Sequence, residues 1–125
     1  MQDHLYREII LEHWKHPQNY GVIKPADIDI SDTNPLCGDE IHITARIKED
    51  KVTDIAFESL GCAISKASAS LFTEEIKGKT IKDIEAITSE DSIGLLEVTL
   101  TPARTKCALL VYTTLNKALA DRSSS

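Results

Sequence analysis

The sequence has little positive charge, few aromatic residues and no long apolar run. It contains 14 Lys and Arg against 20 Asp and Glu, for a formal net charge of −6 and a pI near 5.1. Because a protein that binds the nucleic-acid backbone needs a basic surface, this balance argues against nucleic acid as a partner. No apolar run approaches the roughly 20 residues of a membrane-spanning helix, and the first ten residues lack the layout of a signal peptide. We therefore expect no membrane association and a cytoplasmic protein.

Cysteine is also scarce, with only Cys37, Cys62 and Cys107. An odd number of cysteines in a reducing compartment argues against a disulfide framework. Their spacing fits no zinc-finger or zinc-ribbon pattern, in which the ligands come in close pairs. Metal binding, sulfur chemistry and simple burial of the thiols remain open.

The length and composition are those of one globular domain. The chain has 125 residues, of which 42% are hydrophobic and 27% charged. These values are ordinary for a protein with a single hydrophobic core. We expect one domain over residues 1–121, followed by a frayed, serine-ended tail over 122–125.

Apolar residues recur at helical spacing in four segments. The expected helices are 2–15, a helix from near Cys62 to Gly78, a short helix over 80–87 capped by Thr80, and a final helix over 101–122. We expect Cys107 in the first turn of the final helix.

Alternating apolar and polar residues predict two strands, 40–48 and 51–61, which a tight turn would join in an antiparallel hairpin. His42 falls on the polar side of the first strand, so we expect a solvated side chain there. A further short strand is expected over 95–100. The stretch 18–35 is rich in Pro, Gly, Asn and Asp without a sustained period, and predicts a long ordered loop.

The cysteines are all expected at the ends of elements. Cys62 follows Gly61 at a helix start, where unpaired N–H groups and the helix dipole favour the thiolate. Cys37 lies in a Pro/Gly turn two residues before Asp39. Three sulfurs and one carboxylate would suit a tetrahedral zinc ion or a two-iron cluster. Incidental thiols, with Asp39 in an Asx turn, are the alternative.

Three separated stretches resemble, in order, the signatures of the U-type iron–sulfur cluster scaffold proteins, the IscU, NifU and SufU group. They are LYREIILEHWKHPQNYG, NPLCGDEI with ESLGCAISKASASLFTEEIKGKT, and PARTKCALL. The resemblance extends from about Leu5 to Leu119. It implies a compact α+β domain in which helices pack on one face of a small antiparallel β-sheet of about three strands, with the cysteines gathered at one end.

The resemblance implies a scaffold for iron–sulfur cluster assembly. Such proteins accept sulfur from a cysteine desulfurase, build a [2Fe-2S] cluster with iron and transfer it to apo iron–sulfur acceptor proteins. The implied ligands are Cys37, Cys62 and Cys107, with Asp39 as an additional ligand that regulates release. Cys37 and Cys107 are the candidate persulfide acceptors, and a homodimer is compatible with the resemblance.

Near the third cysteine the chain combines features of two subgroups. IscU-like members have a His directly before this cysteine and a proline-rich chaperone motif upstream, whereas here Lys106 takes the place of the His. We therefore do not expect a dedicated Hsp70 chaperone. Lys106 is an auxiliary candidate for orienting a persulfide by its charge, and Arg104 for pairing with Asp39 or stabilising a thiolate.

SufU-like members suggest a second function for the same four ligands. They also carry Lys before the third cysteine, and resemble zinc-dependent sulfurtransferases in which a cysteine released from zinc accepts persulfide sulfur. Their insertion between the second and third cysteines is missing here, which favours the scaffold. A structural zinc domain acting as an interaction module is the third and least favoured hypothesis.

Overall fold

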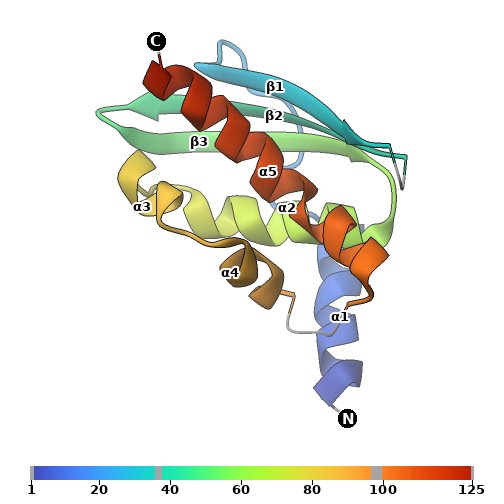
Figure 1. Ribbon diagram of the computed structural model, residues 1–125. Helices are drawn as coiled ribbons and strands as arrows, with labels where there is room; N and C mark the ends of the chain where they lie inside the picture. The colour runs from blue at the N-terminus through green and yellow to red at the C-terminus, as the bar shows by residue number, and fades with distance from the viewer. Residues whose placement is uncertain (1, 36–37, 97–99, 125) are drawn as a thin grey trace.

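The computed structural model describes residues 2–35, 38–96 and 100–124, and has helices packed on one side of a small sheet (Figure 1). The elements in chain order are α1 (Gln2–Lys15), β1 (Ile28–Asn34), β2 (Asp39–Lys48), β3 (Lys51–Leu60), α2 (Ala63–Ile76), α3 (Ile81–Glu85), α4 (Ser89–Gly94) and α5 (Pro102–Ser124). The predicted α+β class with a three-stranded antiparallel sheet is confirmed. None of the described helices is both long and apolar enough to cross a membrane.

The sheet has the order β1-β2-β3, and β2 and β3 form the predicted antiparallel hairpin. Its two turn residues, Glu49 and Asp50, both have positive φ values of 52° and 63°, as a tight hairpin turn requires. Ile43 lies opposite Phe57 in the register, and both side chains are fully buried. Alternate residues of the hairpin thus form the apolar face that the helices cover.

The remaining strand is not the one predicted from the sequence. The expected strand over 95–100 is wrong where the structure describes it, since Leu95 and Leu96 follow directly on α4; residues 97–99 lie outside the described residues. The third strand is β1, which lies inside the predicted loop and pairs with β2 from Ile28 opposite Ala45 to Asn34 opposite Asp39. Within β1 only Ile28 is fully buried, so the strand depends on pairing with β2 more than on its own apolar pattern.

The four predicted helices are present, and α4 is an additional one. The predicted Thr80 cap of α3 is confirmed by a hydrogen bond from the Asp83 N–H to its hydroxyl. In α4, Thr88 and Asp91 form a capping box. Helix α5 continues to Ser124, into the segment 122–125 expected to be a tail.

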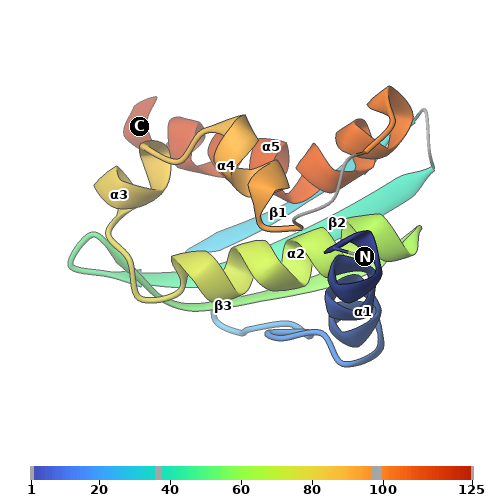
Figure 2. The same cartoon turned by 90° about the horizontal axis from the view of Figure 1, so that it is seen from below.

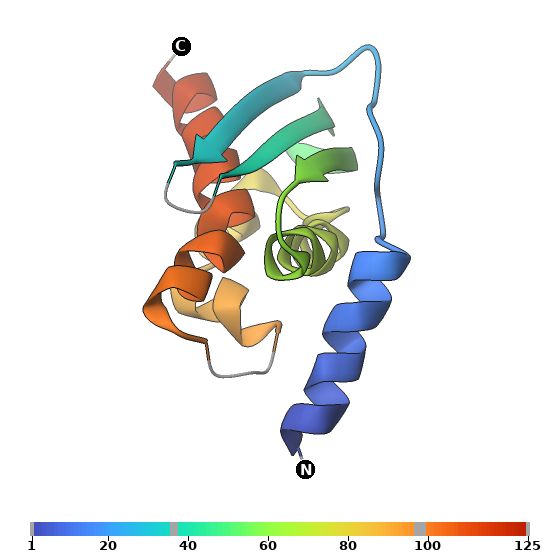
Figure 3. The ribbon, with the colours of Figure 1, turned by 90° about the vertical axis from the view of Figure 1, so that its right-hand side faces the viewer.

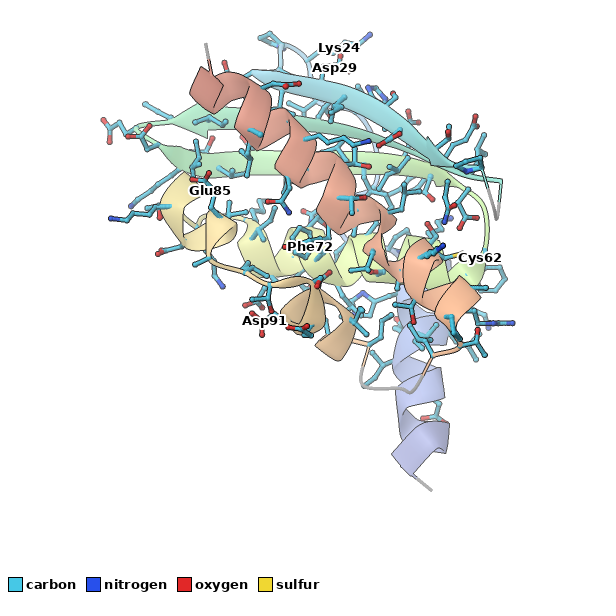
Figure 4. All side chains as sticks on the ribbon, viewed as in Figure 1. Lys24, Asp29, Cys62, Phe72, Glu85 and Asp91 are labelled. Atoms are coloured by element: carbon cyan, nitrogen blue, oxygen red, sulfur yellow. The ribbon has the colours of Figure 1, made fainter. Side chains whose placement is uncertain are left out.

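Helices α2 and α5 lie on one face of the sheet, as Figures 1 and 2 show from two directions, and α1 packs against α2. Small residues permit the close approach of α2 to its neighbours, because Ala67, Ser68 and Ala69 are all buried. The Ser68 hydroxyl donates a 2.6 Å hydrogen bond to the Ala108 carbonyl of α5. The rings of Phe72 and Tyr112 meet edge to face between these helices, with centroids 6.1 Å apart; Figure 4 labels Phe72.

The opposite face of the sheet is partly covered by the segment before β1. This segment runs from the end of α1 to the far edge of the sheet, as Figure 3 shows. At the edge of β3, the Gly21 N–H donates to the Phe57 carbonyl. Further along, the Ile23 N–H donates to the hydroxyl of Thr44, and the Arg46 guanidinium donates to the Pro25 carbonyl. The loop predicted from composition is therefore ordered over its first part and shields the buried Thr44.

Candidate metal centre

Three of the four predicted ligands lie together at one end of the molecule. Asp39 begins β2, Cys62 immediately precedes α2 and Cys107 belongs to α5. One ligand atom from each lies within 4.8 Å of the other two. Cys62 is labelled in Figure 4, beside the first half of α5. Cys37, the fourth predicted ligand, lies outside the described residues.

Cys62 is the N-cap of α2, which agrees with its expected place at a helix start. Its backbone is extended, with φ −76° and ψ 164°, and the Ser65 N–H donates to its Sγ at 3.5 Å. A sulfur atom thus occupies the place that a Ser, Thr or Asp oxygen usually takes at a helix start. The side chain is exposed. Its sulfur is therefore accessible from solvent, which both metal binding and sulfur transfer require.

Asp39 is almost completely buried, at 1% exposure, and its carboxylate points toward Cys62. The Cys62 backbone N–H donates to Oδ1 at 3.0 Å, and the Cys62 thiol donates to Oδ2 at 3.7 Å. A buried carboxylate is costly unless its oxygens are hydrogen-bonded. The contacts with Cys62 offset part of this cost and hold an oxygen beside the sulfur.

Cys107 lies one turn deeper in its helix than the sequence suggests. Helix α5 begins at Pro102, and the Arg104 N–H donates to the Thr101 hydroxyl at 3.3 Å, as in an N-cap followed by proline. The expectation that Cys107 lies in the first turn is therefore wrong, because it is the sixth residue of the helix. Its side chain is buried, at 5% exposure, by contrast with the exposed Cys62.

The two auxiliary candidates lie on the exposed side of α5. Arg104 and Lys106 are both exposed, on either side of the half-buried Thr105. In the part of the chain that the structure describes, Arg104 makes no ion pair with Asp39. Lys106 lines a surface depression together with Asn34, at the end of β1. The proposed roles of both cations therefore stay predictions.

Two of the described donor atoms have the separation of ligands of a single tetrahedral metal ion. With Zn–S near 2.3 Å and Zn–O near 2.1 Å, two ligands of one tetrahedral ion are separated by about 3.6 Å. Cys62 Sγ and Asp39 Oδ2 are 3.7 Å apart. Two sulfurs and one carboxylate oxygen are also ligand types that zinc and iron accept. The residues could therefore hold a metal with little rearrangement.

His42 lies on the other face of the sheet and takes no part in this cluster. His42 lies on the polar face as expected and is 30% exposed, and it also has acidic neighbours: its Nε2 lies 2.6 Å from Asp29 Oδ1 and its Nδ1 lies 3.8 Å from Glu58 Oε1. Glu58 is its direct partner on β3, and Asp29 is a diagonal neighbour on β1. Such cross-strand pairing was not visible without knowing that β1 joins the sheet.

Comparisons with known proteins show the family to which the chain belongs. The family model described as NifU-like N terminal domain matches residues 5–124. The chain is 39% identical to the zinc-dependent sulfurtransferase SufU of Bacillus subtilis, over 94% of this chain and 91% of that protein. It is 33% identical to the iron-sulfur cluster assembly scaffold protein IscU 1 of Archaeoglobus fulgidus, over 94% of this chain and 76% of that protein.

Among solved structures, the N-terminal part of a nitrogen-fixing NifU-like protein from Brucella abortus has the same fold. Its TM-score is 0.80 at 20% identity, and the alignment covers 98% of this chain and 97% of that one.

Proposed function

Because the chain belongs to the NifU-like N-terminal domain family, we propose that it is a scaffold on which iron–sulfur clusters are assembled. It accepts sulfane sulfur from a cysteine desulfurase and combines it with iron in a [2Fe-2S] cluster, with a reductant supplying the two electrons that convert each sulfane sulfur to sulfide. It then transfers the cluster to apo iron–sulfur proteins. The family resemblance predicted from the sequence motifs is confirmed by the match over residues 5–124 and by the relatives named SufU and IscU.

The observation that carries this proposal is the convergence of Asp39, Cys62 and Cys107. These residues come from three elements, and Cys62 is exposed rather than part of the hydrophobic core. Two thiols and a buried carboxylate within 4.8 Å of one another form a binding site for a thiophilic metal. Cys37 completes the proposed site as its fourth ligand, on the basis of its position two residues before Asp39 in the sequence.

Sulfur transfer uses the nucleophilic thiolates of this site. A thiolate of Cys37 or Cys107 attacks the outer sulfur of the desulfurase persulfide, the S–S bond of that persulfide breaks, and the desulfurase cysteine leaves as a thiolate. Cys107 is buried, so attack by this residue requires that docking of the desulfurase expose it. Cys62 stays a ligand, and Asp39, as the harder and weaker donor, makes the cluster easier to release.

A zinc-dependent sulfurtransferase is the second candidate. It is supported by the 3.7 Å separation of Cys62 Sγ and Asp39 Oδ2, which suits one ion, and by the similarity to the Bacillus protein. In this function Cys37, Asp39, Cys62 and Cys107 would hold zinc, which would keep the thiolates deprotonated until one of them accepts sulfur. The alignment with the Bacillus protein runs over 135 positions, more than the 125 residues of this chain. That protein therefore has inserted residues that this chain lacks. We favour the scaffold because other relatives at least 30% identical to this chain are named iron-sulfur cluster assembly scaffold proteins.

Anaerobic reconstitution distinguishes the cluster scaffold from the zinc-dependent sulfurtransferase. The apo-protein is mixed with a cysteine desulfurase, cysteine, a thiol reductant and ferrous iron, the visible absorption is followed, and the product is offered to an apo-ferredoxin. We expect a two-iron chromophore that the ferredoxin acquires, and no chromophore with the Cys62→Ser variant. The opposite result is that no chromophore forms, that zinc accelerates desulfurase turnover and that a cysteine of this protein becomes persulfidated. The protein would then be a zinc-dependent sulfurtransferase and not a scaffold.

A further inference from the structure

We propose that Gly61 is a positioning residue of the metal centre, because only a residue without a side chain lets the Asp39 carboxylate lie against the backbone beside Cys62. This inference rests on the proposed function, since it concerns the same site. It assigns to Gly61 the task of setting where the oxygen ligand lies relative to the Cys62 sulfur.

The crowding at Gly61 is severe. A Cβ atom added there would lie 2.0 Å from Asp39 Oδ1 and 2.7 Å from its Cγ, far inside van der Waals contact. At the chain's other four glycines, all among the described residues, the added atom would meet nothing within 4 Å. The close approach is therefore specific to the glycine that precedes Cys62.

Asp39 could not avoid the added atom without losing its present contacts. Its side chain is buried, and Oδ1, the atom that would be hit, accepts the Cys62 N–H at 3.0 Å. Displacement of the carboxylate would break this hydrogen bond and move Oδ2 from its place 3.7 Å from the Cys62 sulfur. Oδ2 and the Cys62 sulfur would then no longer have the separation of two ligands bound to one tetrahedral ion.

The backbone at Gly61 is a separate constraint. Its φ of +145° is one that residues with a side chain rarely adopt, so Gly61→Ala would strain the chain as well as crowd Asp39. Gly78 also has a positive φ, of +88°, but its added Cβ would meet nothing. Gly78→Ala therefore serves as the control for backbone strain without crowding.

The test is cobalt(II) binding by the purified apo-protein, because the visible ligand-field bands of cobalt report on coordination. The variants are Gly61→Ala, Asp39→Ala, their combination and Gly78→Ala. We expect Gly61→Ala to change these bands in the same way as Asp39→Ala and to weaken cobalt binding at least tenfold. The thiolate-to-cobalt charge-transfer band should remain, since no cysteine is altered, and Gly78→Ala should match the wild type.

The double variant separates action through Asp39 from general damage. If Gly61 acts by placing Asp39, adding Gly61→Ala to Asp39→Ala should weaken cobalt binding no further. In the metal-free protein, faster exchange of the Cys62 amide hydrogen in both single variants would report the broken contact with Asp39.

A folded Gly61→Ala protein with wild-type cobalt bands and affinity would overturn the inference, as would additive losses in the double variant. Wild-type protein that binds cobalt but assembles no cluster would overturn the scaffold proposal and leave the role of Gly61 supported. A folded wild-type protein that takes up no cobalt would overturn both.

Discussion

Asp39 has a structural role and a proposed chemical role, and substitution by Asn or by Ala separates the two. Its Oδ1 accepts the Cys62 N–H, and its carboxylate is the proposed oxygen ligand. Asp39→Asn keeps a carbonyl oxygen for the N–H and removes the charge, whereas Asp39→Ala also leaves the N–H unpaired, at a cost of about 1–3 kcal/mol. We expect both variants to transfer a reconstituted cluster to apo-ferredoxin more slowly than the wild type. Only Asp39→Ala should lower the free energy of unfolding clearly.

Denaturant unfolding of the apo-proteins and the rate of cluster transfer measure these two effects. Unchanged transfer by Asp39→Asn would remove the carboxylate from the release step. Equal stability of the two variants would show that the hydrogen bond to Cys62 contributes little.

Cys62 likewise has two separable tasks, as a cap and as a ligand. Its Sγ accepts the Ser65 N–H, and a serine hydroxyl would accept the same hydrogen bond. We expect Cys62→Ala to lose about 1 kcal/mol of unfolding free energy from the missing cap, and Cys62→Ser to stay close to the wild type. Both should lose high-affinity zinc binding. Thermal unfolding of the metal-free proteins measures the difference, and equal melting temperatures for Ala and Ser would argue against the cap.

At the scale of elements, the small residues of α2 set its distance from its neighbours. Ala69 has no exposed surface and belongs to the main core cluster with Phe72 and Leu115. Ala69→Leu would force a larger side chain into a filled space and should destabilise the fold by about 1–3 kcal/mol. Glu74→Leu, at an exposed position of the same helix, is the control and should change stability little. Chemical denaturation measures both, and equal effects would contradict close packing at Ala69.

An ion pair joins the last helix to the edge of the sheet. Lys117 Nζ on α5 lies 2.6 Å from Asp32 Oδ2 on β1. The hydrogen bonds from Lys117 and from the Thr33 N–H hold the pKa of the Asp32 carboxyl below its ordinary value. Because the folded-state pKa is lowered, the pair adds stability above the unfolded-state pKa of about 3.9 and loses it as the pH falls through the folded-state pKa.

We therefore expect Lys117→Met to be less stable than the wild type at pH 7 and to approach it at pH 2–3. The difference at pH 7 should be below about 1 kcal/mol, because Lys117 is 63% exposed and solvent screens the pair. Urea unfolding at the two pH values gives the comparison. If Lys117→Met is as much less stable than the wild type at pH 2–3 as at pH 7, the loss comes from packing of the Lys117 side chain and not from its charge.

The strand β1 shows why one element could not be predicted from local pattern. Its sequence, IDISDTN, alternates two isoleucines with polar residues, but turn-forming Asp, Ser and Asn dominate it. The strand is stabilised by hydrogen bonds to β2, which follows it closely in the chain, and by packing of α5, which lies far along the sequence. The contribution of α5 could not be seen in the local pattern. By contrast, the hairpin β2–β3, the start of α2 near Cys62 and the Thr80 cap of α3 are local features, and the sequence predicted them correctly.

For the whole molecule, metal binding should couple directly to folding. The proposed ligands come from β2, the start of α2 and α5, so only the folded chain brings them together. Zinc at one hundred times its dissociation constant should stabilise the protein by about 2.7 kcal/mol. We expect a chelator to reverse this gain and Cys107→Ser, which is nearly isosteric, to abolish most of it. Thermal unfolding with and without zinc measures the effect, and full stabilisation of Cys107→Ser would exclude Cys107 as a ligand.

The site was predicted from family motifs rather than from spacing. The distances along the chain between Asp39, Cys62 and Cys107 match no compact metal motif, so spacing alone left incidental burial of the thiols equally open. What the sequence could not show was how the site is supported. The burial of Cys107, the direction of the Asp39 carboxylate and the space left by Gly61 all depend on contacts between distant elements.

The placement of Cys107 in the last helix also has a consequence during protein synthesis. While a ribosome is still translating the region before α5, the emerging chain carries Asp39 and Cys62 but lacks Cys107. A nascent chain therefore holds an incomplete donor set and competes poorly for iron or zinc. We therefore expect metal loading only after α5 has been made and has docked on the sheet.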